Sequence, residues 1–187
     1  MALELKHIYK SYGEDTIFLN FSLIFPDACT MAVVAPPKWG KTTLMNLIAG
    51  LEQPDYGKIL GRKRISMLFQ ENRLLERASV YENLNFVCRA ENLKLKMPAL
   101  LGLFELEHLI NKKAGYLNPC EQRRLAIVRA LIPDFGLLLL DEPLKGIENK
   151  PNTAEFISRI AGNRQIIITT QNVEDARLFN AKVLQII

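Results

Sequence analysis

The sequence predicts an α/β protein with a mostly parallel sheet covered by helices. Three short apolar runs, residues 31–34, 137–140 and 166–170, are typical of buried parallel strands. The segments between them contain apolar residues at helical spacing, and strands that alternate with helices favour a parallel sheet. The length of 187 residues is enough for one domain with a sizeable core.

Composition and charge narrow the class of protein. Hydrophobic residues make up 49% of the chain, so it should fold, and no apolar run is long enough to span a bilayer. Cys29, Cys88 and Cys120 have no metal-ligand spacing, and an odd number does not suggest a disulfide framework. No leader opens the sequence, so we expect a cytosolic location. The net charge of +4 permits an anionic ligand.

The first third of the chain reads mainly as strands. Residues 1–30 and 58–69 have the pattern of short strands, with turns expected at Tyr12-Gly13, Pro26-Asp27 and Tyr56-Gly57. The basic run at 62–64 has no aromatic residues interleaved with it, so we interpret it as a solvated turn and expect no nucleic-acid partner.

The stretch "VVAPPKWGKTTLMNLIAG", residues 33–50, is predicted to be a strand, a loop and a helix. Val33 and Val34 end an apolar run that begins near Met31. Helical spacing then relates four apolar residues: Leu44, Leu47, Ile48 and Leu51. Gly50 and Pro54 are the expected stop signals.

Two helix starts further along the chain are marked by capping boxes. Ser79 precedes Glu82 by three residues, and residues 79–114 are helix-rich by pattern, with a break near Pro98. The second start combines Asn118 at the cap, Pro119 at the first helical position and Glu121 closing the box. Its apolar face is Leu125, Val128 and Ile132, and Pro133 ends it. A last strand is expected in "VLQII" at the end of the sequence.

The loop before the first helix has the chemistry of a phosphate-binding loop. Such a loop directs backbone N–H groups and a helix N-terminus at anionic oxygens, a lysine reaches the terminal phosphates, and the next hydroxyl holds magnesium. The candidate phosphate-binding residues are Lys38, Trp39, Gly40, Lys41, Thr42 and Thr43. A chance Gly-Lys-Thr at a helix start is the alternative, because this tripeptide alone is common.

The first half of the loop departs from the expected pattern. Pro36 and Pro37 have no N–H group, and Ala35 and Lys38 stand where glycines are expected. A left-handed Lys38 would cost on the order of 1 kcal/mol, which strains the loop without abolishing it.

Two acids follow the apolar run at 137–140. Asp141 is placed to hold a magnesium ion through water, and Glu142 to polarise an attacking water. The alternative is that these are two acids at an ordinary strand end. The presence of Gly-Lys-Thr about one hundred residues earlier in the same chain makes this alternative much less favoured.

The ordered set of motifs resembles the ATP-binding subunits of ABC transporters over nearly the whole chain. The pieces are "LKHIYKSYG", "MLFQENRLLERASVYENL", "YLNPCEQRRLAIVRAL", "LLLLDEP", "LKGIE" and "IIITTQNVEDARLF". The resemblance implies a P-loop NTPase core with a mostly parallel sheet, a small antiparallel β subdomain and a helical subdomain at about 71–118. We expect residues 1–187 to be one ATP-binding domain without a regulatory domain after it.

The resemblance also implies roles for individual residues toward ATP and Mg²⁺. Tyr12 stands where an aromatic ring stacks on adenine. The implied metal-site residues are Thr42, Gln70 and Asp141. The implied catalytic residues are Glu142, Gln70 and Gln171, the last at the position of the switch histidine. Asn118 and Cys120 lie in the signature stretch, which in this family closes the ATP site of a second subunit.

Departures from the family pattern concentrate at catalysis. The signature has Asn118, Pro119 and Cys120 where the family has a serine and two glycines. Gln171 can form hydrogen bonds but cannot change charge near neutral pH. Glu148 replaces an aspartate in the loop after the acidic strand.

Three hypotheses for function follow. The first is an ATPase that drives solute import, slowly, from the cytoplasmic face of the membrane through a permease subunit and a second ATP-binding subunit. The second is a nucleotide-binding module that hydrolyses little beside a more active partner. The third, which Ala35, Pro36 and Pro37 motivate, is a protein that binds no nucleotide. Gln70 and the signature-like helix disfavour a small-molecule kinase. The "FQENRLL" run is most like importers of nitrate, sulfonate and taurine.

Overall fold

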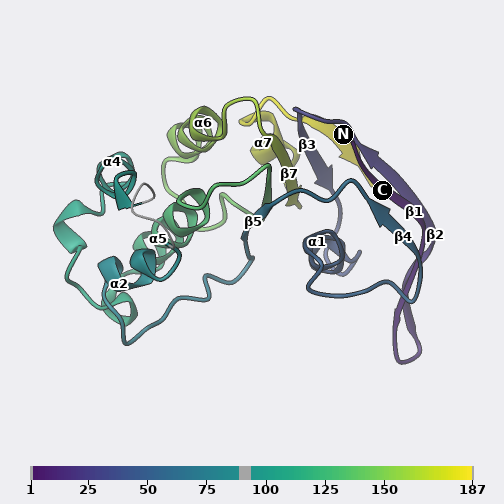
Figure 1. The fold of residues 1–187 in the computed structure, drawn as a ribbon, viewed down its shortest axis with the longest axis horizontal. Coiled ribbons are helices and arrows are strands. Elements are labelled where there is room, and N and C mark those ends of the chain that lie inside the picture. Colours follow the sequence, from purple (N-terminus) through teal and green to yellow (C-terminus); the bar gives the residue numbers. More distant parts are fainter. Residues whose placement is uncertain (1, 89–93, 187) are drawn as a thin grey trace.

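The strands form two sheets of different kinds (Figure 1). The computed structural model describes residues 2–88 and 94–186. The antiparallel sheet has the order β2-β1-β4, from β1 (Leu3–Tyr12), β2 (Asp15–Phe25) and β4 (Tyr56–Leu60). The parallel sheet has the order β5-β6-β7-β3-β8, from β5 (Ile65–Leu68), β6 (Leu137–Asp141), β7 (Gln165–Thr170), β3 (Thr30–Val34) and β8 (Lys182–Gln185). The predicted α/β class is confirmed.

Helices cover both faces of the parallel sheet. On one face, α1 (Lys41–Ala49) packs between the two sheets, and its buried side chains share a core with residues of β1, β2 and β6. The other face is covered by α5 (Pro119–Leu131), α6 (Lys150–Ala161) and α7 (Val173–Arg177). Leu137 and Leu139 join the first core, whereas Leu138 and Leu140 join the second, as the alternation of side chains along a strand requires.

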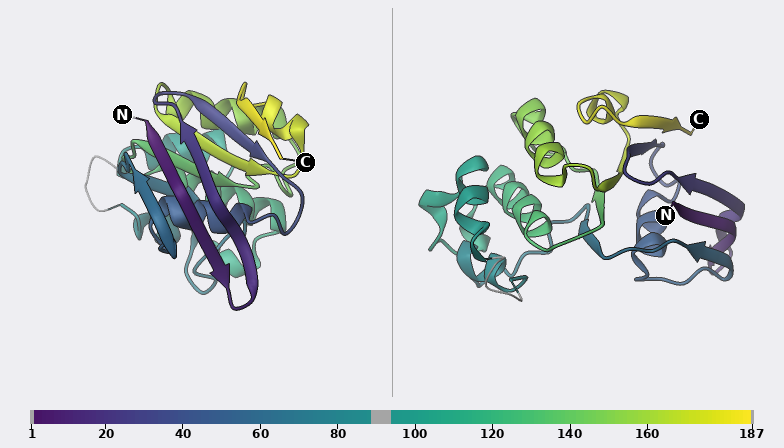
Figure 2. Two further views of the ribbon diagram at one scale, coloured as in Figure 1. Left: turned by 90° about the vertical axis from the view of Figure 1, so that its right-hand side faces the viewer. Right: turned by 45° about the horizontal axis from the view of Figure 1, so that its top comes forward.

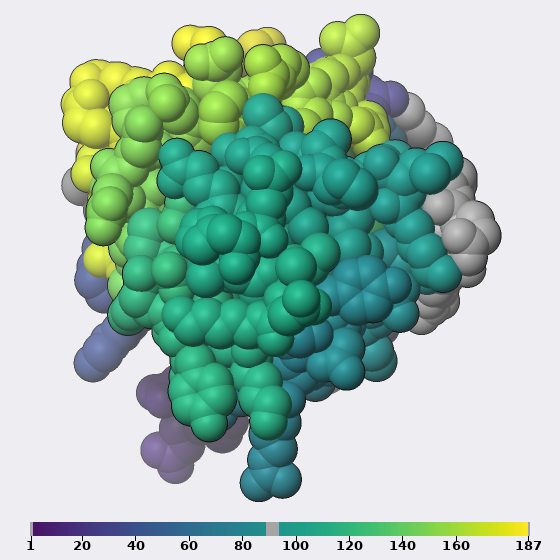
Figure 3. Space-filling view, turned by 90° about the vertical axis from the view of Figure 1, so that its left-hand side faces the viewer, coloured from purple at the N-terminus to yellow at the C-terminus, as the bar shows by residue number. Residues whose placement is uncertain are grey.

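The remaining helices are short and lie at one end of the molecule. They are α2 (Val80–Asn85), α4 (Met97–Leu103), η1 (Glu107–Leu109) and η2 (Ala114–Tyr116). Figure 2 shows this helical end opposite the antiparallel sheet, and Figure 3 views the molecule from it. All four fall within about 71–118, while the limits of a helical subdomain stay a prediction. Within residues 2–88 and 94–186, no helix is long and apolar enough to cross a bilayer.

Both predicted capping boxes are confirmed. The Ser79 hydroxyl accepts from the Glu82 N–H, and the Glu82 carboxylate accepts from the Ser79 N–H. At the start of α5 the Asn118 Oδ1 accepts from the Glu121 N–H at 2.8 Å, and the return bond is also 2.8 Å. The two helix starts are therefore fixed by local chemistry that the sequence already carries.

The predicted break near Pro98 is present, since residues 95 and 96 are not helical and Pro98 stands in the first turn of α4. Three other local predictions are wrong, for reasons of tertiary structure. Tyr56-Gly57 is not a turn but the start of β4, where a Cβ on Gly57 would lie 2.4 Å from the His7 carbonyl oxygen of β1. Leu51 lies beyond α1 and is 58% exposed. The strands before residue 30 are long, because β1 and β2 form an extended hairpin.

The sequence pattern also missed two helices. Both begin at an asparagine whose side chain caps the first turn: Asn149 accepts from the Asn152 N–H, and Asn172 accepts from the Glu174 N–H. Pro151 at the start of α6 is a second local signal. Neither cap is a capping box, because Asn152 and Asp175 stand at the third helical position, where a box has glutamate or glutamine.

Candidate functional site

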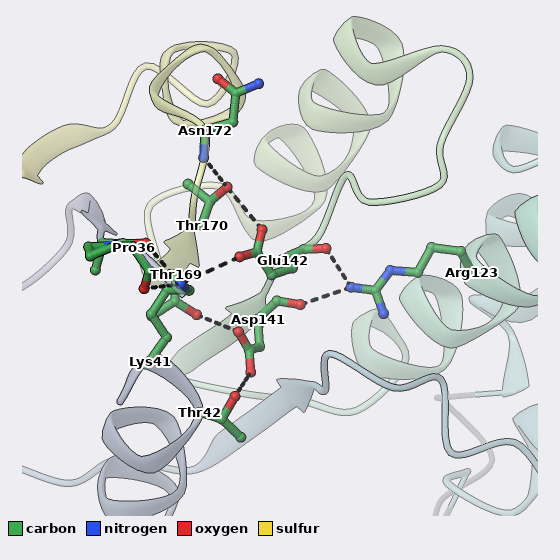
Figure 4. A network of polar contacts seen from close by, with 10 residues as sticks. Pro36, Lys41, Thr42, Arg123, Asp141, Glu142, Thr169, Thr170 and Asn172 are labelled. Carbon is green, nitrogen blue, oxygen red and sulfur yellow. Dashed lines mark hydrogen bonds and ion pairs between the residues drawn. The ribbon is translucent and has the colours of Figure 1, made fainter. Parts of the chain in front are cut away.

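Three loops meet at the carboxyl ends of neighbouring parallel strands. β3 pairs with β7 and β7 pairs with β6, with Val34 opposite Thr170 and Asp141 opposite Thr169. The loop after β3, the turn after β6 and the end of β7 therefore lie side by side (Figure 4). Such an edge, outside the carboxyl ends of the strands, is where open α/β sheets bind ligands.

Lys41 is buried at the centre of this edge, with 8% of its surface exposed. Its Nζ donates to the carbonyl oxygens of Ala35 at 2.8 Å and Pro36 at 2.9 Å. The Glu142 Oε1 lies 4.0 Å from the same Nζ. Burial lowers the pKa of Lys41, and the charges of Glu142 and Asp141 oppose that shift. The ammonium group is thus held by two neutral carbonyls and one carboxylate, all close to the start of α1.

Thr42 and Asp141 form the second contact between the loop and the acidic turn. The Thr42 hydroxyl donates to Asp141 Oδ2 at 2.9 Å, and the Thr169 hydroxyl donates to Asp141 Oδ1 at 2.8 Å. Both oxygens of this fully buried carboxylate are therefore fixed, one by α1 and one by β7. The hydroxyl and carboxylate that the sequence assigned to the metal site do lie together.

The two carboxylate oxygens of Glu142 differ in their hydrogen bonds. Its Oε2 accepts from the Thr170 hydroxyl at 3.1 Å, whereas its Oε1 is buried with no hydrogen-bond partner among the described residues. The backbone of Glu142 is left-handed, with φ of 48°, and its N–H donates to the Thr169 carbonyl oxygen at 2.9 Å. A buried carboxylate oxygen without a donor requires compensation by a water or a ligand group.

Aromatic rings of β2 pack against Trp39 in the loop after β3. The Trp39 ring makes edge contacts with Phe18, at 5.4 Å between centroids, and Phe21, at 5.8 Å. Lys38 has φ of 67°, the left-handed conformation expected of it. Gly40, with φ of 107°, is required by packing as well, because a Cβ there would lie 2.5 Å from Ile17 Cγ2.

The predicted phosphate donors differ in what they contact in the structure. The Trp39 N–H donates to the Pro36 carbonyl oxygen at 3.4 Å, so a ligand would have to compete with this bond. Gly40 at the N-cap provides no side chain to the first turn of α1. The N–H groups at the start of this helix, which include those of Lys41, Thr42 and Thr43, are thus left for an anion.

Tyr12 lies beside the start of α1, at the end of β1. Its hydroxyl donates to the Glu52 carboxylate and is also within hydrogen-bonding reach of Thr43. Burial and the Glu52 carboxylate raise the pKa of Tyr12. The residue is 45% exposed, with Lys10 Nζ 5.1 Å from the centroid of its ring. The structure thus places Tyr12 at the surface beside the start of α1, while its stacking on adenine stays a prediction.

The other predicted site residues are not part of the Lys41–Glu142 network. Gln70 and Gln171 are exposed, one after β5 and one after β7. Asn118 uses its carbonyl oxygen as a cap at the start of α5. Cys120 lines a cavity of about 410 Å³ together with Glu148. The structure therefore joins the loop to the acidic turn and leaves the altered residues at its periphery.

Sequence reasoning missed Arg123, which is 3% exposed on α5. Its Nη2 donates to the carbonyl oxygens of Asp141 at 2.9 Å and Glu142 at 2.8 Å (Figure 4). Its Nη1 donates to the Phe69 carbonyl oxygen at 2.8 Å. Burial lowers the pKa of Arg123 to about 10 against the opposing effect of the two acids. No local signal identifies this residue, because "EQRRL" has the composition of a solvated helix face.

The residues present fit a nucleotide with a magnesium ion. Lys41 and the open end of α1 suit phosphate oxygens, and the Glu142 Oε1, which accepts no hydrogen bond among the described residues, suits a donor such as water. The described residues contain no cluster of three or more histidine, cysteine or acidic side chains that could hold a metal ion alone. Thr42 and Asp141 therefore fit Mg²⁺ that arrives with phosphate, since this ion usually takes few protein ligands and completes its shell with water and phosphate.

Comparisons of the chain with protein families and with curated proteins give matches that agree with one another. The family model described as "ABC transporter" matches residues 19–145. The spermidine/putrescine import ATP-binding protein PotA of Clostridium acetobutylicum is 34% identical over 166 residues, which cover 80% of this chain and 47% of PotA. The sulfate/thiosulfate import ATP-binding protein CysA of Acinetobacter baylyi is 32% identical, over 80% of this chain and 48% of CysA. The chain thus spans about half the length of these relatives.

A solved structure has the same fold. A dimer of the ATP-binding cassette MJ0796 in a post-hydrolysis state, bound to ADP and Pi, superposes with a TM-score of 0.84. The match covers 98% of this chain and 94% of the other, at 24% sequence identity. At this level of identity the comparison establishes the fold alone.

Proposed function

The chain belongs to the ABC transporter family, and from this premise we propose that it is an ATP-binding subunit that binds and slowly hydrolyses ATP to drive solute import. One observation carries the proposal. Lys41, Thr42, Asp141 and Glu142, which come from two motifs about one hundred residues apart, form one hydrogen-bonded and ion-paired network. A chance Gly-Lys-Thr would have no reason to meet an acidic strand end.

The phosphates would bind where Lys41 now lies against its own loop. The amino group is held by the Ala35 and Pro36 carbonyls, both neutral acceptors, so an anionic oxygen would replace them with a stronger charged partner. Thr42 and Asp141 would hold the magnesium ion, which when bound neutralises charge on the phosphate oxygens. The Thr169 hydroxyl keeps Asp141 oriented toward Thr42 during this exchange.

Glu142 is the residue that supplies acid–base chemistry in this proposal. Its Oε2 is anchored on Thr170, and Oε1, which faces Lys41 but accepts no hydrogen bond among the described residues, is left to accept a proton from an attacking water. The anchor is itself fixed, because the Asn172 N–H donates to the Thr170 hydroxyl at 3.1 Å. Gln70 and Gln171, both exposed, would approach the nucleotide only from outside this network.

Slow turnover is the expected consequence of the altered residues. Gln171 cannot carry a charge near neutral pH, and Pro119 has no N–H group to offer a phosphate across a subunit interface. The α5 start nevertheless keeps its capping box, so its positive end is still formed. We therefore expect the altered residues to slow the closure of the ATP site by a second subunit, and to have little effect on nucleotide binding.

The test is ATP hydrolysis by the purified chain, alone and with a permease. We expect measurable turnover that depends on Mg²⁺ and falls in a Glu142→Gln variant. Turnover no higher than that of the variant, with ATP still bound, would instead support the second candidate, a nucleotide-binding module beside a more active partner. The altered signature residues Asn118, Pro119 and Cys120 favour that candidate.

A protein that binds no nucleotide is the third candidate. The loop supports it in two ways: Pro36 and Pro37 offer no N–H group, and the Trp39 N–H is used within the loop. Calorimetry with Mg–ATP decides the matter, because no detectable heat up to millimolar ATP would leave only this candidate.

The partners are also part of the proposal. We infer a membrane permease subunit and a second ATP-binding subunit, with the chain peripheral at the inner face of the membrane through the permease. The named relatives import polyamines or sulfate, whereas the "FQENRLL" run resembles importers of nitrate, sulfonate and taurine. The transported solute is set by the permease and its binding protein, so it should be tested with the proteins encoded nearby.

A further inference from the structure

Arg123 is a buried arginine whose guanidinium touches two of the proposed catalytic segments at once. We propose that it is a positioning residue: it fixes the turn at residues 141–143 and ties that turn to the segment after β5, so that Glu142 keeps its place relative to Gln70. The proposal deepens the proposed function, on which its kinetic part rests. Its structural part concerns the chain alone.

The contacts divide between the two segments. On the side of the acidic turn, Nη2 donates to the carbonyl oxygens of Asp141 and Glu142, and Nε lies 3.4 Å from the Pro143 carbonyl oxygen. On the other side, Nη1 lies 2.8 Å from the Phe69 carbonyl oxygen and 3.3 Å from that of Gln70. The Asn72 Oδ1 is also 3.2 Å from Nη1. Apart from Asn72, every acceptor is a backbone carbonyl.

Backbone acceptors are what a positioning role requires. A carbonyl oxygen cannot move without moving its chain, whereas a carboxylate could rotate away on its own side chain. The guanidinium is planar and offers five N–H groups in a rigid fork, so it fixes several carbonyls in one geometry. Arg123 makes no hydrogen bond to the Asp141 or Glu142 carboxylate among its recorded contacts, and both carboxylates stay directed at Lys41, Thr42 and β7.

The backbone conformation of Glu142 is one that the surrounding structure has to stabilise. Its φ of 48° is the left-handed region, which is unfavourable for a residue with a side chain. Three hydrogen bonds hold its backbone there: its N–H donates to the Thr169 carbonyl oxygen, and its own carbonyl oxygen accepts from Arg123 Nη2 at 2.8 Å and from the Lys145 N–H at 3.2 Å. Only the Arg123 bond ties this carbonyl to α5, so without it we expect the turn to be held less tightly and the Glu142 carboxylate to leave its position beside Thr170.

A second arginine of the same helix is a matched control. Arg129 donates to the carbonyl oxygens of Asn72 at 2.6 Å and Arg73 at 2.7 Å. Burial lowers its pKa in the same direction as that of Arg123. Among residues 2–88 and 94–186, its side chain forms hydrogen bonds only with the segment after β5 and not with the acidic turn. A general loss of stability should therefore appear in both variants, whereas loss of positioning should appear only at Arg123.

The experiment compares Arg123→Lys and Arg129→Lys in the full chain by hydrogen exchange. Lysine keeps the charge but cannot bridge this set of carbonyls. We expect Arg123→Lys to speed exchange by about tenfold or more in peptides that cover 139–145 and 66–73, because their opening is no longer coupled. Arg129→Lys should affect only the peptides around 70–75. Equal exchange at 139–145 in wild type and Arg123→Lys would overturn the proposal.

Kinetics supply the second readout. For Arg123→Lys we expect a fall in kcat of about tenfold or more while the Kd for Mg–ATP stays within about threefold, because Lys41 and the loop make no contact with Arg123. A loss of binding equal to the loss of turnover, shared by Arg129→Lys, would show a merely structural role and contradict the proposal. If the wild type binds no nucleotide, the proposed function fails, but the exchange experiment still decides the role of Arg123.

Discussion

The Lys41–Glu142 network and the start of α5 differ in how far their side chains agree with the family pattern. In the network, the side chains that the family resemblance requires are present and in contact, from Lys41 to Glu142. At the start of α5 the backbone is kept, with a complete capping box, while the three signature side chains are replaced. The difference teaches that the start of this helix does not depend on the signature side chains of the family, because the cap needs only Asn118 and Glu121.

The comparison also separates two kinds of function. The network lies within one chain, so under the proposed function we expect it to bind a nucleotide without a second subunit. The α5 start acts, by the family resemblance, on the site of a second subunit. We expect changes there to affect how two subunits act together more than how one subunit binds a nucleotide. A protein with an intact first region and a changed second one should therefore bind better than it hydrolyses.

The largest expected effect comes from Glu142→Gln, which tests the intact region. Glutamine keeps the size and can still bond Thr170, but it cannot accept a proton, so turnover should fall by about 10²- to 10⁴-fold. ATP binding should change by less than about threefold. The measurement is phosphate release with purified protein, with the exposed Glu148→Gln as control. A similar fall in both variants would remove the special role of Glu142.

A smaller effect is expected from Gln171→His, which repairs part of the changed region. Turnover of the variant should rise several-fold above that of the wild type. It should also increase with pH through about 6.5, because only the neutral imidazole can accept a proton. Steady-state rates between pH 5.5 and 8 check this, with wild type as the reference. An unchanged rate and pH profile would mean that Gln171 does not limit hydrolysis.

The smallest effect concerns the cap that preserves the changed region. Asn118→Ala should lower the free energy of unfolding by about 1 kcal/mol, as should Ser79→Ala at the other capping box. Asn118→Ser should leave it nearly unchanged. Urea unfolding gives these values. Suppose that Asn118→Ala left the free energy of unfolding unchanged while Ser79→Ala lowered it. The start of α5 would then not depend on its cap, which would contradict the explanation that Asn118 and Glu121 maintain it.

Features set by neighbouring residues could be predicted from the sequence. The two capping boxes and the buried strand that ends at Asp141 depend on spacing within a few residues. The meeting of Lys41 with Glu142 was implied only by the family resemblance, which relates segments far apart in the chain. The structure then supplied the hydrogen-bond partners.

Features set by distant contacts could not be predicted. Gly57 has the sequence of a turn, but it is glycine because β1 passes too close for a side chain. Arg123 and Arg124 are adjacent and alike in sequence. Only Arg123 is fully buried, because the turn after β6 and the segment after β5 both surround it. Its environment comes from residues more than fifty positions away along the chain on one side and about twenty on the other.

The most direct test is a calorimetric titration of the full chain with Mg–ATP, together with Lys41→Ala and Lys38→Ala. Lys41 is buried in the network, whereas the Lys38 side chain is exposed, and the backbone N–H by which Lys38 is expected to bind phosphate is kept in alanine. We predict saturable binding with one ATP per chain, weakened by about tenfold or more in Lys41→Ala and little changed in Lys38→Ala. No binding by the wild type, or equal binding by wild type and Lys41→Ala, would contradict a nucleotide site at this network.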